Sequence, residues 1–409
     1  AYLFGNLADR VKTAAFVSFL SQHHIRVHAT AEASGFLVPV EQKTYRLIRT
    51  IFEEVSTFRD TSFYDISSWT LPLAFDIPVT ELSSLKGIEY SGEPVDPMPV
   101  IGQVLGGRAS TGYLFRWDEY SSPRVLYALQ SAGLRTRVAT KKFSIGVGDG
   151  MEDFAMGTVQ LPLANQAIKK DRIHELVSDL AEKTGVDFYA LSTGLTPAGI
   201  DMGSSSFNAL EKPDILIFTG GSTSSGKAGE IWHLLDQRNG IPVTLVATDA
   251  LRNVKLENYS TVILPGGSYG EWNSEEVERL KRWTRDGGVL IAVGQATGWA
   301  AEHDLGKSTF KEAVPTDSTR YLSYSQRRTE SSIQGIGGAI LKAELDLSHP
   351  LCYGYARDEL AIFKRGTRVA RPLEGKYMEP VRFSSEPYLS GWISAENLER
   401  LQGAPVFSI

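Results

Sequence analysis

The pattern of apolar and polar positions is most regular between residues 260 and 300. A short apolar run at 261–264 ends in Pro-Gly-Gly, and a second run at 289–293 ends in Gly294. Between the runs, apolar side chains recur at helical spacing until two glycines stop the helix at 287–288. Strand, glycine-rich loop, helix and strand in this order predict a parallel α/β unit. Its loops follow the carboxyl ends of the strands, where open α/β sheets place their sites.

Further apolar runs extend this pattern toward the N-terminus. A buried strand is expected at 214–218, an amphipathic helix at 228–237 and another strand at 242–246. Together with the unit at 260–300, these elements predict a sheet of parallel strands connected by helices.

Beyond residue 300 the periodicity weakens. Strands are expected at 331–341 and 360–364, and a short helix ends at residue 401. Ser394 could cap this last helix, and Glu396 would then lie in its first turn, where the helix dipole favours an acid.

The first half of the chain contains a repeated order of elements. Tyr-Leu-Phe begins both copies, at 2–4 and at 113–115, and a helical stretch and a strand-like run follow each. A second strand and a second helix come next, and the copies end on strands that begin with Phe-Tyr at 63–64 and 188–189. This order is the split βαβ pattern, found twice. An insertion at 143–154, rich in glycine and acidic residues, is expected to be an exposed loop.

These patterns predict the fold class and the domains. The fold class is α/β, with two split β-α-β-β-α-β repeats followed by a flavodoxin-like parallel-sheet domain. The first repeat is expected at 1–91 and the second at 112–205, joined by a proline-rich linker at 92–111. The parallel-sheet domain is expected at 210–409.

Composition and charge limit the functions open to the chain. Of its 409 residues, 42% are hydrophobic and 22% are charged, which is ordinary for globular proteins with substantial cores. The net charge of −6 and the lack of a Lys/Arg run argue against a nucleic-acid partner. A single cysteine, Cys352, excludes an internal disulfide framework. No apolar run approaches the roughly 20 residues of a membrane span, so no membrane partner is expected.

The glycine-rich loops of the parallel unit resemble those of the class I glutamine amidotransferase-like fold. Gly266 and Gly267 match the loop whose amides stabilise an oxyanion in that fold. Gly294-x-Ala296-x-Gly298 matches its nucleophile elbow, with alanine in the place of the cysteine. A methyl group cannot attack a carbonyl, so thioester chemistry is excluded and we expect a degenerate amidotransferase site.

Another glycine-rich loop follows the strand expected at 214–218. Gly221, Gly226 and Lys227 nearly complete the phosphate-binding pattern G-x-x-x-x-G-K-[ST], but Ala228 stands where a hydroxyl would bind Mg²⁺. The free amides of a strand-to-helix turn can still hold an anion. The sequence therefore predicts a possible anion loop rather than a nucleotide hydrolase.

A serine hydrolase is an alternative interpretation of the same region. Ser268 lies in a G-x-S-x-G pattern, and Asp346 and His349 follow in the order that α/β-hydrolases use. His349 can equally be explained as part of a turn, with its ring hydrogen-bonded locally. Ser268 and His349 are the catalytic candidates, and no residue of this chain is expected to bind a metal.

Several passages together resemble one family, the large bacterial zinc carboxypeptidases of the carboxypeptidase A-like metallopeptidase class. The passages are residues 35–40, 63–73, 113–117, 231–238, 241–244 and 264–269. The more specific ones are Phe-Tyr-Asp-Ile-Ser at 63–67 and Trp-His-Leu-Leu-Asp-Gln-Arg at 232–238. In this family a catalytic domain is followed by an accessory half that ends in an amidotransferase-like domain. The resemblance spans essentially the whole chain and implies that it is this accessory half.

The zinc site of that family needs a His-x-x-Glu pair and a distant second histidine, and none of the seven histidines here begins such a pair. The chain opens on Ala1 with neither Met nor a signal peptide, so we expect it to be processed or a fragment. The resemblance places the zinc-bearing domain upstream of Ala1 and implies no cofactor in this chain. The implied partners are that carboxypeptidase domain and its peptide substrate. The parent protein is expected to be secreted or periplasmic.

The leading hypothesis is a non-catalytic accessory region of a zinc metallocarboxypeptidase, whose upstream domain would hydrolyse peptides with a metal-activated water. Two alternatives stay open. One is a serine hydrolase that uses Ser268 and His349. The other is a module that holds a small anion or a peptide between the glycines at 220–221 and those at 266–267.

Overall fold

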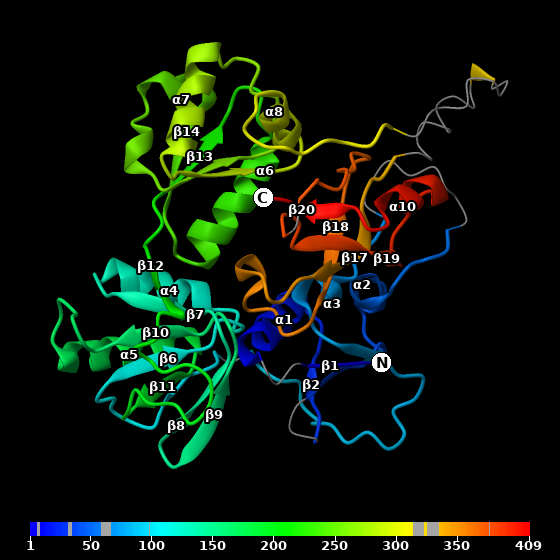
Figure 1. Cartoon of the computed structure of the whole chain (residues 1–409). Helices are drawn as coiled ribbons and strands as arrows, with labels where there is room; N and C mark the ends of the chain where they lie inside the picture. The colour runs from blue at the N-terminus through cyan, green and yellow to red at the C-terminus, as the bar shows by residue number, and fades with distance from the viewer. Residues whose placement is uncertain are drawn as a thin grey trace. The chain divides into compact units, whose positions relative to one another are not determined.

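The computed structural model describes residues 1–5, 9–31, 35–58, 67–97, 99–313, 323–324, 335–375 and 377–409. These residues form two compact units. Unit 1 comprises residues 1–101, 118–120 and 310–409, and unit 2 comprises residues 102–117 and 121–309. The fold class is mixed α/β, with several sheets that include a parallel one (Figure 1). The domain boundaries expected from the sequence stay predictions.

The first sheet of unit 1 is antiparallel, with the strand order β2-β3-β1-β4. Its strands and helices are β1 (Tyr2–Phe4), α1 (Arg10–Gln22), β2 (His28–Ala29), β3 (Phe36–Val38), α2 (Tyr45–Phe52), α3 (Leu71–Phe75) and β4 (Val79–Glu81). α2 buries Ile48, Ile51 and Phe52, three and four positions apart, so one side of this helix faces the core. The first residues of the strand expected to begin at 63–64 lie outside the described residues, and β4 pairs with β1 on the side opposite β3.

The last part of the chain forms the second sheet of unit 1, with the order β18-β17-β19-β20. Its elements are β17 (Ala339–Leu345), β18 (Glu359–Lys364), β19 (Val381–Ser390), α10 (Ala395–Leu401) and β20 (Pro405–Phe407). The strand predicted at 360–364 is confirmed as β18. The predicted cap of the last helix is also confirmed, because the hydroxyl of Ser394 accepts a hydrogen bond from the N–H of Asn397.

A buried hydroxyl joins the second sheet of unit 1 to the segment that follows α2. Ser390, at the end of β19, is fully buried. Its hydroxyl oxygen accepts hydrogen bonds from the N–H of Val55 at 2.9 Å and from the hydroxyl of Ser68 at 2.7 Å. Beside it, the N–H of Gly391 donates to the carbonyl of Val55 at 2.8 Å. The segment that follows α2 is thereby fixed to the end of β19, 335 positions further along the chain.

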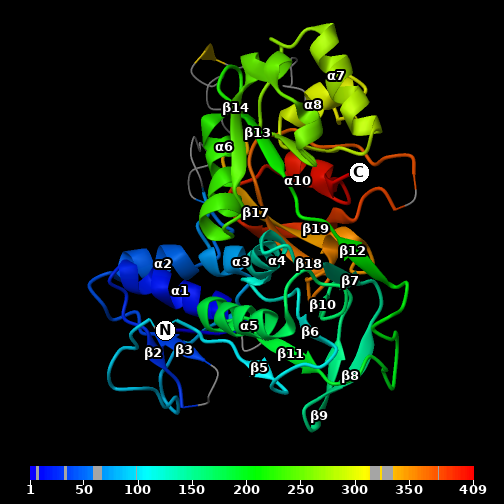
Figure 2. The ribbon, with the colours of Figure 1, turned by 90° about the vertical axis from the view of Figure 1, so that its left-hand side faces the viewer.

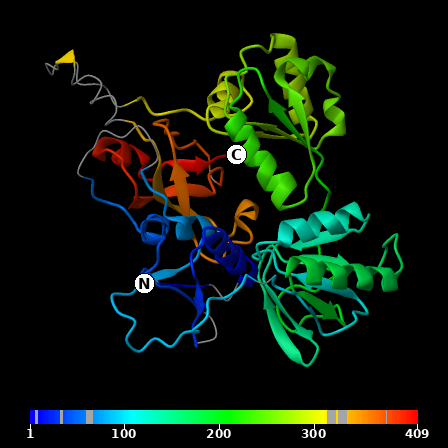
Figure 3. The same cartoon turned by 180° about the vertical axis from the view of Figure 1, so that it is seen from behind.

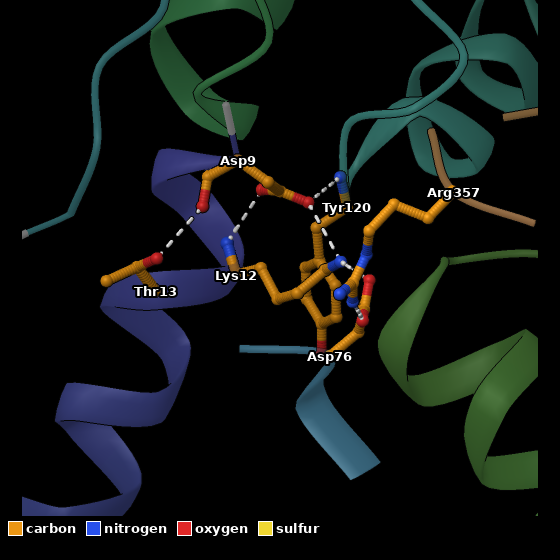
Figure 4. Close-up of polar contacts among 6 residues, drawn as sticks. All are labelled: Asp9, Lys12, Thr13, Asp76, Tyr120 and Arg357. Carbon is orange, nitrogen blue, oxygen red and sulfur yellow. Dashed lines mark hydrogen bonds and ion pairs between the residues drawn. The ribbon is translucent and has the colours of Figure 1, made fainter. Parts of the chain in front are cut away.

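A second polar cluster of unit 1 surrounds Asp9, which caps α1 (Figure 4). One carboxylate oxygen accepts from the N–H of Lys12 and the other from the N–H of Tyr120, each at 2.9 Å. The amino group of Lys12 lies 3.8 Å from Asp9 and 3.9 Å from Asp76, which also pairs with Arg357. Burial raises the pKa of Asp9, and the hydrogen bonds and the charge of Lys12 oppose this rise only in part.

The first part of unit 2 is a six-stranded sheet with the order β12-β7-β10-β6-β11-β5, antiparallel except for the pair β11 and β5. Its elements are β5 (Val104–Leu105), β6 (Gly112–Phe115), α4 (Ser122–Ser131), β7 (Thr136–Ala139), β10 (Val159–Pro162), α5 (Lys170–Thr184), β11 (Phe188–Leu191) and β12 (Phe207–Leu210). α4 and α5 lie side by side over one face (Figure 3, turquoise and green). Phe115 of the sheet, Leu129 of α4 and Val177 of α5 belong to one buried core.

The opposite face of this sheet is covered by a β-hairpin, where the sequence analysis predicted an exposed loop. The hairpin consists of β8 (Phe143–Val147) and β9 (Gly150–Phe154). Phe143, Ile145 and Val147 are buried against the sheet. The prediction was wrong because the glycines and acidic residues of the segment concealed the alternation of apolar side chains in β8, which marks a half-buried strand.

The second part of unit 2 is a sheet whose strand pairs are all parallel, in the order β14-β13-β15-β16. Its elements are β13 (Ile215–Thr219), α6 (Ser225–Trp232), a π-helical turn (His233–Arg238), β14 (Val243–Ala247), two 3₁₀ turns (Thr248–Asn253, Leu256–Asn258), β15 (Thr261–Leu264), α7 (Ser274–Arg285), β16 (Val289–Ala292) and α8 (Ala296–Glu302). α6 packs on one face, and α7 and α8 pack on the other (Figure 2). The parallel α/β unit predicted at 260–300 is therefore confirmed. α7 buries Val277, Leu280 and Trp283, the apolar positions of its helical period.

Replacing Ser390 by alanine tests the joint between β19 and the segment that follows α2. The change leaves the N–H of Val55 and the hydroxyl of Ser68 without this buried acceptor, so we expect the free energy of unfolding to fall by about 1–3 kcal/mol. Ser384→Ala is the matched control on the same strand, because the hydroxyl of Ser384 is buried without a hydrogen-bond partner among the described residues. The control should be neutral or stabilising. Urea unfolding measures both, and an equal loss in the two variants would contradict the assignment.

Replacing Asp9 by asparagine tests its raised pKa. Below the ordinary carboxyl pKa of 3.8, the folded state holds the Asp9 proton more tightly than the unfolded chain does, and this stabilises the native protein. The stabilisation is lost as the pH rises from 3.8 through the raised folded pKa. Urea unfolding at successive pH values measures the free energy of unfolding of the native protein and of Asp9→Asn. We expect the difference, native minus variant, to decrease as the pH rises from 3.8 through the raised pKa of Asp9.

Asp346, whose pKa is shifted in the opposite direction, is a control for the pH dependence expected of Asp9. Hydrogen bonds from Ser348 lower the pKa of Asp346, so its stabilisation is present above 3.8 and is lost as the pH falls through the lowered folded pKa. The corresponding difference for Asp346→Asn should therefore increase with pH. A difference for Asp9→Asn that is flat, or that rises like the control, would show that Asp9 does not have a raised pKa.

Candidate functional site

Three loops lie at the carboxyl ends of neighbouring strands in the parallel sheet. They cover residues 220–224 after β13, 265–270 after β15 and 293–295 after β16. The first two loops are in direct contact. Thr223 and Gly267 form an isolated β-bridge, and the N–H of Ser224 donates to the carbonyl of Gly266 at 2.7 Å. The glycine-rich motifs at 220–221 and 266–267 therefore lie in two loops that touch each other.

The third loop leads into α8, and the predicted elbow runs from Gly294 of this loop to Gly298 in the first turn of α8. Ala296 is the first residue of α8 and is fully buried. Gly294 has a positive φ of 61°, and Gly298 is buried in the helix. Gly266 lies beside this loop, because a Cβ added to it would be 3.9 Å from the backbone nitrogen of Gln295. The two predicted glycine motifs are thus adjacent, and the residue between the elbow glycines offers no nucleophile.

A carboxylate that no sequence motif indicates, Glu271, lies next to the first loop. Glu271 accepts hydrogen bonds from the hydroxyl of Ser222 at 2.8 Å, from its N–H at 3.5 Å and from the hydroxyl of Thr248. Partial burial works to raise the pKa of Glu271, but these hydrogen bonds outweigh it and hold that pKa below its ordinary value. Glu271 is therefore anionic at neutral pH. Ser222 lies 49 positions away in the chain, so no local motif could reveal this contact.

The basic residue of the possible anion loop has a partner on its own helix. Gly226 and Lys227 lie in the first turn of α6. The amino group of Lys227 pairs with Glu230 at 3.0 Å. A phosphate held by the amides near Gly221 would also lie beside the charge of Glu271, which disfavours a second anion there.

Ser268 and His349 belong to different units. Ser268, in unit 2, is exposed, and its hydroxyl has no hydrogen-bond partner among the described residues. In unit 1, Nδ1 of His349 accepts from the N–H of Leu351 at 3.2 Å, which confirms the locally hydrogen-bonded ring expected for a turn. The carboxylate of Asp346 likewise has a local partner in Ser348. A catalytic pair of Ser268 and His349 stays a prediction.

Aromatic rings pack against the second loop, which covers residues 265–270. Tyr269 has a positive φ of 49° and is fully buried, and its hydroxyl donates to the carbonyl of Pro265 at 2.6 Å. Burial raises the pKa of that hydroxyl, so it keeps its proton. The rings of Trp272 and Trp299 pack on Tyr269 with centroid distances of 4.7 and 5.4 Å. These contacts offset the cost of a left-handed backbone at a residue with a side chain.

Comparison of the chain with protein-family models, with curated proteins and with solved structures finds no match. Within the described ranges, no three His, Cys, Asp or Glu side chains are grouped so that they could hold a metal ion. None of the helices in the described part of the chain is long and apolar enough to cross a membrane. The loops of the parallel sheet and the motifs they carry are therefore the basis for a functional proposal.

Substitution of Gly221 tests how tightly the first loop is closed. Gly221 has a φ of 54°, and an added Cβ would overlap the hydroxyl of Thr248 and lie 2.6 Å from an oxygen of Glu271. Gly220, with a φ of 74° and open space around its added Cβ, is the matched control. We expect Gly220→Ala to lower the free energy of unfolding by about 1–2 kcal/mol through backbone strain alone. Gly221→Ala should cost about 1–3 kcal/mol more, from overpacking. Equal losses in urea unfolding would show that Glu271 and Thr248 do not close the loop.

Proposed function

We propose that this chain is a non-catalytic accessory region of a zinc metallocarboxypeptidase, and that another domain of the same polypeptide hydrolyses the peptide. The observation that carries the proposal is the methyl group of Ala296. This residue is buried at the start of α8, between Gly294 and Gly298 and next to the loop of Gly266 and Gly267. A site that has the glycine loops of this fold but no nucleophile between them cannot form a covalent intermediate.

The geometry of the parallel sheet supports a relation to the class I glutamine amidotransferase-like fold. β15 and β16 are neighbours, paired in parallel from Thr261 opposite Val289 to Leu264 opposite Ala292. Because parallel strands end at the same edge, the loop after β15 and the elbow after β16 lie together. In the fold that they resemble, these two segments supply the oxyanion-stabilising amides and the thiol. This chain retains the glycines and lacks the thiol.

The two antiparallel sheets support the inference that the first half of the chain is a duplication. In unit 1 the strand order is β2-β3-β1-β4, and in unit 2 the order β7-β10-β6-β11 forms the middle of the six-stranded sheet. In chain order, the four strands are β1, β2, β3 and β4 in unit 1, and β6, β7, β10 and β11 in unit 2. In both sheets the second strand lies at one end, followed by the third, the first and the fourth. A duplicated split βαβ unit would share such an order.

The described residues do not fit a zinc site. A carboxypeptidase-type site needs two histidines and a carboxylate that face one ion. His28, His174 and His303 each place Nδ1 against a different segment, at distances of 2.7–2.9 Å from its hydrogen-bond partner. In this proposal the zinc and the water that it activates therefore belong to the other domain. The role of this chain is to pack on that domain or to orient its substrate.

The proposal is tested with the complete product of the gene that encodes this chain and with the chain alone. We expect the complete product to release C-terminal amino acids from peptides and to contain about one zinc ion per polypeptide, because such sites bind a single catalytic ion. The chain alone should do neither. Chromatography of the released amino acids and elemental analysis of the purified proteins measure both properties.

A matched control is the complete product in which the first histidine of its own His-x-x-Glu pair is replaced by alanine. This variant should lose zinc and activity together while this chain is unaltered. Release of C-terminal residues by the chain alone would contradict the proposal. A complete gene product with neither zinc nor peptidase activity would contradict it as well.

A further inference from the structure

Unit 1 contains a cavity of about 540 Å³ that the proposed function does not use. Its walls come from the end of α2, from α3 and β4, and from β17 and β18. The cavity therefore lies between the two sheets of unit 1. Its volume falls within the range of about 300–1,000 Å³ that is typical of ligand sites.

Two open strand edges reach this cavity. β4 is the last strand of the first sheet and β18 is the first strand of the second, so each pairs with a neighbour on one side only. Among the described residues, neither strand has a backbone hydrogen bond on its other side. Val79 and Glu81 of β4 and Leu360 and Ala361 of β18 line the cavity. The unpaired N–H and C=O groups of such an edge can accept an extended polypeptide as an additional strand.

More acidic than basic side chains line the cavity. Five carboxylates and three basic side chains contribute to its walls. Each of the three basic side chains forms an ion pair with one of the carboxylates. Glu54 and Glu81 remain, exposed and without an ion-pair partner among the described residues. The cavity thus has an excess of negative charge at the end of α2 and on β4.

The two walls are held in place without a ligand. The hydroxyl of Ser390 connects β19 to the segment after α2 through Val55 and Ser68. Asp76 and Arg357, which both line the cavity, form an ion pair across it from the end of α3 to the segment before β18. A site that is already formed does not have to be ordered when a partner binds, which favours affinity.

We propose that this cavity binds an extended polypeptide segment that carries basic side chains. The backbone of the segment pairs with the open edge of β4, and its lysine or arginine side chains meet Glu81 on that strand and Glu54 after α2. A basic segment is favoured over an acidic one because the charges left unpaired are carboxylates. The inference rests on unit 1 alone and does not depend on the assignment to a metallopeptidase.

The test uses the whole chain and three fluorescein-labelled peptides of eight residues in fluorescence anisotropy. The first peptide alternates lysine and threonine, the second alternates glutamate and threonine, and the third is the lysine peptide with N-methylated backbone amides. We expect the lysine peptide to bind and its affinity to fall with added salt. The glutamate peptide should not bind. The N-methylated peptide should bind several-fold more weakly, because it keeps the charges and loses the donors for strand pairing.

Variants of the chain separate specific binding from general attraction to an acidic protein. Glu54→Gln combined with Glu81→Gln should weaken binding of the lysine peptide about five-fold, in line with two exposed charge contacts. The control combines Glu182→Gln with Glu211→Gln, two exposed carboxylates of unit 2 that have no ion-pair partner among the described residues. It changes the net charge equally and should leave the affinity unchanged.

Three outcomes would overturn the proposal. The first is equal binding of the lysine and glutamate peptides. The second is an equal loss of affinity in the two double variants, and the third is undiminished binding of the N-methylated peptide. Because all four glutamates are exposed, circular dichroism should show unchanged folding, so a loss of binding reports on the cavity itself.

Discussion

The hydrogen bonds of the Ser390 hydroxyl are the constraint on which unit 1 depends. They connect parts of the chain more than 300 positions apart, and they do so among buried side chains, where an unpaired donor is costly. Neither of the two sheets alone encloses the cavity, since its lining comes from both. This joint, together with the ion pair of Asp76 and Arg357, holds the two walls of the cavity next to each other.

In unit 2, the loops at the carboxyl edge of the parallel sheet are held together by their own hydrogen bonds and by aromatic contacts. The loops after β13 and β15 bond to each other, and Glu271 takes up donors of the first loop that an external anion would otherwise use. Tyr269 and its aromatic neighbours hold the second loop in a backbone conformation that is rare for a residue with a side chain. These loops are thus stabilised by groups of the protein itself. Ala296 is buried beside these loops and offers no nucleophile.

Sequence patterns predicted the elements with local causes and missed the contacts with distant ones. The helical period of α7 and the cap at Ser394 depend on residues three to four positions apart, and both were confirmed. The hairpin that begins at Phe143 was missed because its glycines and acids outweighed a short apolar alternation. Glu271 was missed because its partner Ser222 lies 49 positions away. The cavity could not be predicted at all, since two sheets from opposite ends of the chain create it.

The contrast between the two edges indicates where this chain can still bind a partner. A partner binds through groups that form new hydrogen bonds or ion pairs with it. Unpaired strand edges and charges without a counter-ion are such groups. At the parallel sheet, Ser222 and the loop amide of Ser224 already have partners inside the protein. In unit 1, the edges of β4 and β18 and the carboxylates of Glu54 and Glu81 do not have such partners among the described residues. The proposed binding site of unit 1 therefore has groups available for a partner, whereas Ser222 and the amide of Ser224 in the loops of unit 2 are already bonded within the protein.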